Sequence, residues 1–447
     1  LVGSEMCIRD RFNKHIIEYM RGVYVLLLIS LFGYAGRVGG QESVTITQCY
    51  EWARANYPQI HQMGLIDQTE RYSLSNVGKA WLPQLSVSGK ASYQSDVTKL
   101  PFDGDKISSL LPGFEIPSLS KDQYQVVAQV DQTIWDGGSA RSARALTRAE
   151  ATANREQLES ELYALNDRVN QLYFGCLLQD ELIRQNALLQ KELQVNIERI
   201  EAMMENGVAN QSDLESMEVE LLNARQNEIE LKASRTVYRQ MLATFINKPL
   251  TDQVVLKTPE SPERSLSTQI NRPELRALDA KSEWIETQNK QVTAGLMPRI
   301  GAFVQGGYGR PGLNMLEDSF EPYYVAGVRL SWNLGKLYTL KNDRRKIEVS
   351  RRQIDVQRET FLFNTRLQLL RQNTEIKKMT DLMRADDDII RLRTSIKQAA
   401  EVKLENGVIS VTDLIREINA EDMARQTAAA HRVQRLMTIY NYMYTTN

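Results

Sequence analysis

The sequence predicts a mainly helical chain with a small membrane β-barrel portion and an internal tandem duplication. Three observations carry this prediction. Glycine (24) and proline (12) are scarce for 447 residues, and long runs of Glu, Gln, Arg, Leu and Ala are typical of extended helices. Four short segments alternate apolar and polar residues. The tetrapeptide Glu-Asn-Gly-Val occurs at 205–208 and again at 405–408, each time with an aspartate six residues after the glycine.

The first forty residues are interpreted as processing sequence. Residues 1–19 precede Met20, the expected initiator, and are predicted to be a non-native or upstream leader. Residues 20–40 combine a basic residue, a short apolar run and a small-residue end, which is the layout of a secretory signal peptide. A transmembrane anchor is the alternative, but the apolar run is shorter than the roughly 20 residues that span a bilayer. Any membrane portion is therefore expected to be a barrel.

The repeats are expected at 41–247 and 268–447, joined by a linker at 248–267. Each repeat contains two predicted strands, at about 84–94, 124–135, 299–309 and 323–333. In every strand the period of two gives one apolar and one polar face. Such alternation also suits a soluble β-sandwich. The length favours a membrane, because each segment reaches the roughly 9 to 11 residues that a tilted strand needs to cross a bilayer.

Aromatic residues at the strand ends favour a membrane as well. Tyrosines gather at the loop ends and tryptophans at the helix ends, as in the aromatic girdles of two membrane interfaces. The interface candidates are Tyr93, Tyr124, Trp135, Tyr308, Tyr324 and Trp332. Four strands cannot close a barrel, and open edges are not tolerated in lipid. Two copies with eight strands, or three copies with twelve, are the simplest closures.

A long helix is predicted after each second strand, followed by a turn and a returning helix. Glycine in the repeated tetrapeptide is placed to end the long helix in a left-handed turn, so the recurrence is explained by a helical hairpin. Ser212 and Glu215 fit a capping box for the first returning helix, and Thr412 is expected to cap the second. The long helices are expected at 139–204 and 336–404, the tip turns at 205–212 and 405–411, and the returning helices at 213–246 and 412–443.

Other function classes find little support. Lys and Arg (55) balance Asp and Glu (56), so no basic field exists to attract nucleic acid. The three cysteines and three histidines show no metal-ligand spacing, and no nucleophile or phosphate-binding motif occurs. No enzyme activity, cofactor or metal site is expected. Asp386, Asp387 and Asp388 form either a cation-attracting lining or a solvated helix face.

The combination of signal peptide, tandem repeat, two β-hairpins and glycine-aspartate helix tips resembles the TolC-like outer-membrane efflux family. The resemblance covers about residues 44–445. It implies a homotrimer whose four strands per protomer form a twelve-stranded barrel in outer-membrane lipid, continuous with a long periplasmic α-helical barrel. It also implies docking of a periplasmic adaptor protein at the tips. The docking candidates carried over are Gly207, Val208, Gly407 and Val408.

The resemblance also suggests residues at the periplasmic entrance. Asp213 and Asp413 match the family's tip aspartates, although a plain role in the first helical turn also explains them. Where the best-known members have a second carboxylate, this chain has Arg416, with Glu417 adjacent. The arginine of the family's tip latch is replaced by Ile409. The expected gate candidates are therefore Asp213, Asp413, Arg416 and Glu417, without that latch.

The function that the resemblance implies is a passive outer-membrane exit duct. An inner-membrane pump of a tripartite efflux or type I secretion system would supply the energy, since no nucleotide motif occurs here. The alternative is a periplasmic coiled-coil structural or adaptor protein with a soluble β-domain. The transported substrate and the class of pump are not encoded in any recognisable motif.

Overall fold

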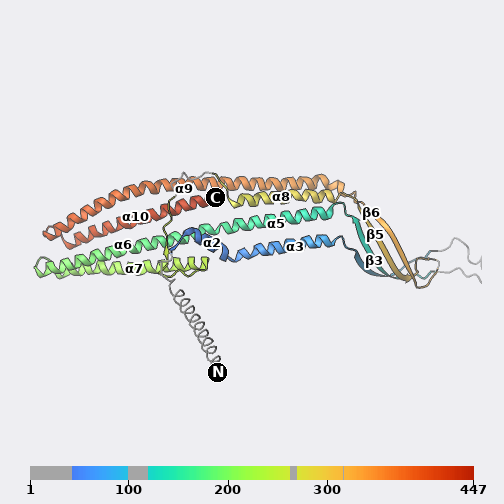
Figure 1. Ribbon diagram of the computed structural model, residues 1–447, viewed down its shortest axis with the longest axis horizontal. Helices are drawn as coiled ribbons and strands as arrows, with labels where there is room; N and C mark the ends of the chain where they lie inside the picture. The colour runs from blue at the N-terminus through green and yellow to red at the C-terminus, as the bar shows by residue number, and fades with distance from the viewer. Residues whose placement is uncertain (1–42, 99–118, 262–268, 316) are drawn as a thin grey trace, which may run out of the picture. The chain divides into compact units, whose positions relative to one another are not determined.

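The structure, a computed structural model, describes residues 43–98, 119–261, 269–315 and 317–447. The predicted leader (1–19) and signal peptide (20–40) lie outside the described residues, as do parts of the first strand-to-strand loop and of the 248–267 linker. The chain divides into two compact units, each assembled from three separate stretches of sequence. Figure 1 labels their elements.

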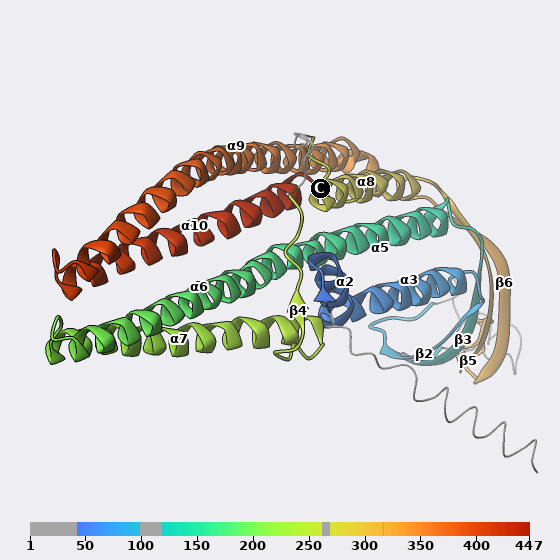
Figure 2. The same ribbon diagram turned by 60° about the vertical axis from the view of Figure 1, so that its left-hand side comes forward.

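The first unit contains two helical hairpins. Helices α6 (Leu165–Glu205) and α7 (Gln211–Ile246) form one, and the ends of α9 (Lys336–Glu405) and α10 (Val411–Thr446) meet in the other (Figure 2). One apolar core joins the two hairpins. Its buried members come from all four helices: Leu193, Ile197, Ile200, Met217, Leu221, Ala224, Ala400, Leu404, Val411, Leu414, Ile415 and Ile418.

The same unit carries a small parallel sheet and a short helix. Strand β1 (Ser43–Val44) pairs with β4 (Val255–Leu256), and α2 (Ile46–Asn56) packs against α7. Tyr173, fully buried, donates its hydroxyl hydrogen to the carbonyl of Val44 at 2.8 Å. The Asn56 side chain donates to the carbonyls of Thr244 and Phe245 near the end of α7, at 3.3 and 3.2 Å. Strand β1 is thus anchored to α6, and helix α2 is anchored to α7.

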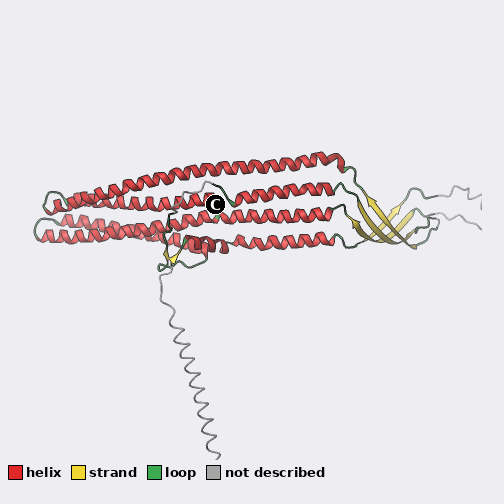
Figure 3. Cartoon of the chain, turned by 45° about the horizontal axis from the view of Figure 1, so that its top comes forward, coloured by secondary structure: helices red, strands yellow, loops and turns green. Residues whose placement is uncertain are grey.

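The second unit combines helices with a curved antiparallel sheet, drawn in yellow in Figure 3. Helix α5 (Ser139–Tyr163) packs against α3 (Gln62–Lys79) and α8 (Pro273–Ala294), and α8 packs on α9 through Ile285, Ile347 and Ile354. The short helix η1 (Pro58–His61) precedes α3. Pro273 stands in the first turn of α8, where its missing N–H costs nothing.

The sheet joins the two sequence repeats. Its order is β2-β3-β5-β6, with β2 at Gln84–Tyr93, β3 at Asp122–Trp135, β5 at Arg299–Arg310 and β6 at Glu321–Ser331. All neighbours are antiparallel, and the central pairing of β3 with β5 links one repeat's hairpin to the other's. Within the described chain, β2 and β6 are edge strands with one unpaired side each.

The first long helix departs from the sequence prediction of one rod over 139–204. It is interrupted at Ala164, between α5 and α6, although Ala164 keeps right-handed helical torsion angles. The interruption follows Tyr163, whose hydroxyl donates to the carbonyl of Tyr444 at 2.9 Å and whose ring stacks on that of Tyr444 at 4.9 Å. These contacts hold Tyr163 against α10. In the second repeat, α9 runs unbroken for 70 residues.

Candidate functional site: helix tips and sheet

Both helix tips are built by the same left-handed glycine turn. Gly207 has φ of +72° and Gly407 has φ of +68°, a region that costs glycine nothing. The amide of Gly207 donates to the carbonyl of Met204 at 2.9 Å, and the amide of Val208 donates to that of Met203 at 2.9 Å. This pair of bonds is the Schellman motif, which satisfies the last carbonyls of the helix. The second tip repeats both bonds with Gly407 and Val408, at 2.8 Å each.

The caps of the returning helices lie two residues before the predicted ones. Asn210, not Ser212, caps α7: its side chain accepts from the amide of Asp213, and Asp213 accepts from the amide of Asn210, both at 3.1 Å. The predicted pairing of Ser212 with Glu215 is wrong because the chain is already extended at Asn210, with φ −118° and ψ 171°. Asp213 is therefore the third helical residue of a capping box.

The second tip forms an equivalent cap. Ser410, not Thr412, caps α10, since its hydroxyl accepts from the amide of Asp413 at 3.2 Å and donates to the Asp413 carboxylate at 2.7 Å. These hydrogen bonds from Ser410, with help from Arg416, hold the pKa of Asp413 below its usual range. Arg416 donates to Asp413 at 2.8 Å. The arginine that stands at the family's second carboxylate position is thus bound to the tip aspartate of its own helix.

The four gate candidates do not converge on one point. Asp213 and Asp413 each cap their own hairpin, and Arg416 stays with Asp413. Glu417 instead pairs with Arg393 of α9 at 3.4 Å. The sequence offered no signal for this pairing, because the two residues lie on different helices of the hairpin.

Each tip exposes one apolar side chain. Val208 is 57% exposed and Val408 is 67% exposed, whereas the following residues, Ala209 and Ile409, pack against the apolar core. The valines are therefore not needed to hold the hairpins together. Ile409, which replaces the expected latch arginine, contributes to the core instead.

A charged cluster, largely shielded from solvent, lies farther along the same hairpins, and no sequence pattern predicted it. Lys397 of α9, with a side chain only 13% exposed, forms ion pairs with Glu192 of α6 and, at 2.6 Å, with Glu421 of α10. Burial alone would lower the pKa of Lys397, but its hydrogen bonds to the two carboxylates raise it. These residues come from three helices, so periodicity along any one helix cannot reveal the cluster.

The sheet has an inverted distribution of polarity. Apolar side chains of one face are strongly exposed, among them Leu85 at 71%, Tyr324 at 80% and Val328 at 70%. Along β3, Tyr124, Val126, Ala128 and Val130 are exposed, and the residues that alternate with them are half-buried. In a water-soluble sheet the apolar face would be the covered one. This face requires an apolar environment or a partner.

The aromatic residues predicted to lie at a membrane interface are all on or beside the sheet. Tyr93, Tyr124, Trp135, Tyr308, Tyr324 and Trp332 are exposed, and Trp332 donates its indole N–H to the carbonyl of Leu296 at 2.9 Å. Tyr124 and Tyr308 flank Phe320, with ring centroids 6.4 and 5.7 Å away. Such amphipathic rings suit the boundary between lipid and water.

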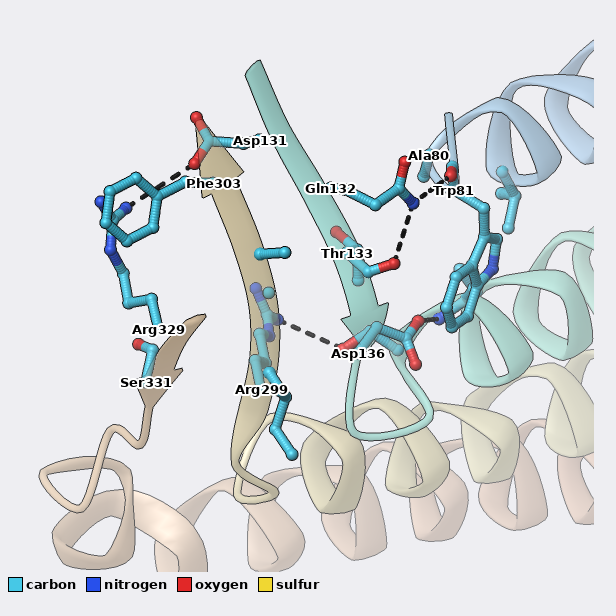
Figure 4. A pocket seen from close by; sticks show the side chains of 17 residues that line it. Ala80, Trp81, Asp131, Gln132, Thr133, Asp136, Arg299, Phe303, Arg329 and Ser331 are labelled. Carbon is cyan, nitrogen blue, oxygen red and sulfur yellow. Dashed lines mark hydrogen bonds and ion pairs between the residues drawn. The ribbon is translucent and has the colours of Figure 1, made fainter. Parts of the chain in front are cut away.

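An open cavity of about 430 Å³ lies where the sheet meets α3 and α5. Figure 4 shows Arg329 beside Phe303 and Asp131 on one side of it. The Arg329 guanidinium lies 4.8 Å from the centre of the Phe303 ring and 3.8 Å from the Asp131 carboxylate. On the other side, Gln132 donates to the backbone carbonyl of Trp81 at 2.9 Å. Arg329 and Asp131 are therefore paired with each other, and Gln132 is paired with the backbone.

None of the described helices carries an apolar stretch long enough to cross a membrane. Over the described ranges, no group of three or more His, Cys, Asp and Glu residues is arranged to hold a metal ion.

Comparison with known proteins gives one family match and several solved structures of similar fold. Residues 49–248 match the family model described as outer membrane efflux protein. None of the curated proteins matches the chain in sequence. Among solved structures, CusC is 13% identical with a TM-score of 0.64, and the alignment covers 90% of this chain and 92% of CusC.

Two further outer membrane proteins are similar in the same way. The open state of the Neisseria gonorrhoeae outer membrane channel MtrE is 14% identical with a TM-score of 0.62, covering 90% of this chain and 88% of MtrE. The Vibrio cholerae outer membrane protein VceC is 12% identical with a TM-score of 0.60, covering 89% of this chain and 95% of VceC. At such identities the likeness is one of fold, and it confirms the predicted fold class of long helices with a small sheet portion.

Proposed function

We propose that this chain, whose residues 49–248 match the outer membrane efflux protein family model, is the passive exit duct of a tripartite efflux or type I secretion system. The description of that family supports an efflux channel in the outer membrane rather than an enzyme. One observation carries the proposal best: the apolar face of the sheet is exposed, and along β3 the residues of the opposite face are half-buried. That arrangement suits a wall with lipid outside and a polar lumen inside.

The unpaired edges of the sheet support assembly from several copies. Strands β2 and β6 each leave a row of backbone N–H and C=O groups without partners in the described chain. In lipid each unsatisfied group costs several kcal/mol, so the edges must pair with other copies. We favour a homotrimer with twelve strands in outer-membrane lipid, continuous with a periplasmic helical barrel. In this arrangement β6 of one copy pairs with β2 of the next.

The tips are the proposed docking site for a periplasmic adaptor protein, which would connect the duct to an inner-membrane pump. Gly207 and Gly407 shape the turns, and the adjacent Val208 and Val408 present apolar side chains that the hairpins do not use. Exposed apolar side chains on a rigid turn are suited to insertion into a partner's groove. The entrance residues Asp213, Asp413, Arg416 and Glu417 would act by fixing the hairpin ends.

The test is the native mass of protein expressed from Met20 and extracted with detergent from purified outer membranes. A three-subunit integral species supports the duct. A soluble monomer overturns it and favours the alternative, a periplasmic coiled-coil protein with a β-domain. A second test compares how much purified adaptor is captured by the wild type and by the double variant Val208→Asp, Val408→Asp. The double variant should capture less.

A further inference from the structure

The charged cluster around Lys397 lies where the two hairpins of the first unit meet. Lys397 comes from α9, and its two carboxylate partners come from the other hairpin (Glu192, α6) and from its own (Glu421, α10). One ammonium group therefore links α6 to the α9 and α10 hairpin. Adjacent residues belong to the apolar core: Leu193 follows Glu192, and Ala400 and Ile418 lie one turn from the other two. The cluster thus sits at the end of that core.

Glu421 is held as a carboxylate despite being only 2% exposed. Thr394 donates to it at 2.5 Å, and Arg425 donates at 3.0 and 2.5 Å. Burial raises the pKa of Glu421, but the hydrogen bonds from Lys397, Thr394 and Arg425 outweigh it and lower the pKa to about 2. The carboxylates of Glu192 and Glu421 are thus held by two cations, Lys397 and Arg425.

Removing the lysine would leave two carboxylates close together at the contact between hairpins. Losing one partner of a buried ion pair is far more damaging than replacing all its charges by neutral groups, because a lone buried charge has no compensation. Asp422 adds to the imbalance, since burial, with the charge of Glu192, raises its pKa to about 6 and it is ionised above that pH. The repulsion is relieved when the hairpins part and water enters.

We propose that Lys397 is a positioning residue that clamps the two hairpins together, so that the closed arrangement of this unit depends on its charge. The inference rests on the proposed function in one respect: in a duct, parted hairpins correspond to a wider periplasmic entrance. The predicted entrance residues near the tips are replaced in this role by a cluster deeper in the bundle. In this cluster the ammonium group of Lys397 forms ion pairs with carboxylates from both hairpins.

The experiment measures how fast a thiol introduced at a core position reacts with a maleimide. Ile418→Cys suits this purpose because Ile418 is 1% exposed and belongs to the shared core, while the native Cys49 and Cys176 are buried. The chain expressed from Met20, which lacks Cys7, is compared in detergent in four backgrounds: wild type, Lys397→Met, Lys397→Arg, and the triple variant Glu192→Gln, Lys397→Met, Glu421→Gln, which removes the lysine together with its two carboxylate partners. Lys403→Gln, which removes an exposed lysine near the tip, is the matched control.

Lys397→Met should react on the order of tenfold faster than wild type, whereas Lys397→Arg and Lys403→Gln should not differ from it. The triple variant should return to within about threefold of wild type, because the carboxylates at positions 192 and 421 no longer repel each other. Unchanged labelling in Lys397→Met overturns the clamp. Equal labelling of the single and triple variants also overturns it, because packing rather than charge would then be responsible.

Conductance of the same preparations in planar bilayers separates the clamp from the duct. If Lys397→Met labels fast and conducts more than wild type, both inferences are supported. If it labels fast and no preparation conducts, the clamp is supported and the duct is refuted.

Discussion

The tip glycines allow a quantitative prediction, because only the backbone is at issue there. Gly207 adopts φ of +72°, and a Cβ atom added to it would meet nothing within 4 Å. Gly207→Ala therefore introduces no clash, only an L-residue in the left-handed region. That conformation costs roughly 1–2 kcal/mol, so we expect the turn to lose about 1 kcal/mol or more. Gly407→Ala should behave alike, since its φ is +68° and its Cβ is equally free.

Hydrogen exchange at the tip measures this loss directly. The amide of Val208 is protected by its 2.9 Å bond to the carbonyl of Met203, which exists only while the left-handed turn is formed. A loss of about 1 kcal/mol raises the opening equilibrium roughly fivefold, and exchange of this amide should accelerate by that factor. Mass spectrometry of peptides spanning 203–210 gives the rate.

Two variants act as controls for this prediction. Gly64→Ala, in α3, also meets nothing within 4 Å but has no left-handed backbone, so it should be neutral or stabilising by up to about 1 kcal/mol. Gly207→Asn should lie between glycine and alanine, because asparagine tolerates the left-handed region. Equal exchange rates for glycine and alanine at position 207, or an asparagine variant worse than alanine, would refute the argument.

Three further predictions concern packing and charge. Gly175→Ala should destabilise the first unit by about 1–3 kcal/mol, because the new Cβ would lie 2.6 Å from the Tyr238 ring. Thermal melting measures the loss of stability, and adding Tyr238→Leu should relieve the clash. Burial raises the pKa of Asp422 to about 6, so the stability linked to its protonation is present below about pH 4 and lost as pH rises through 6. Asp422→Asn should therefore melt higher than wild type near neutral pH, and equal melting temperatures there would contradict the shift. Arg272→Met should cost about 2–3 kcal/mol by leaving Glu274 without its partner, and adding Glu274→Gln should restore much of it in the same melting assay.

Local rules account for the strands and for the glycine turns at the tips, but not for the interruption at Ala164 or for the position of the caps. The positions of the four strands follow from the period of two, and the tip turns follow from Gly207 and Gly407, because a left-handed turn after a helix has a strong glycine preference. The cap was predicted two residues late. A Ser-x-x-Glu pattern fits a capping box at a helix start and also occurs inside a helix, so the pattern alone does not locate the cap. The cap forms where the chain becomes extended, at Asn210.

The tertiary structure decided what lies at the contact between elements far apart in sequence. Lys397, Glu192 and Glu421 are ordinary charged residues of their own helices, and only the packing of three helices makes them a buried cluster. The same holds for Glu417 and Arg393. Periodicity predicts which face of a helix is apolar, but it does not say which helix that face will meet.

The sequence by itself determined the alternating faces of the strands, the duplication and the glycine turns, because these depend on neighbours within a few residues. Only the tertiary structure decided that the apolar face of the sheet is the exposed one and that a lysine is buried between carboxylates. The physical reason is that exposure and pairing are properties of surfaces brought together by folding, and the free energy of a charge or an apolar face depends on what covers it.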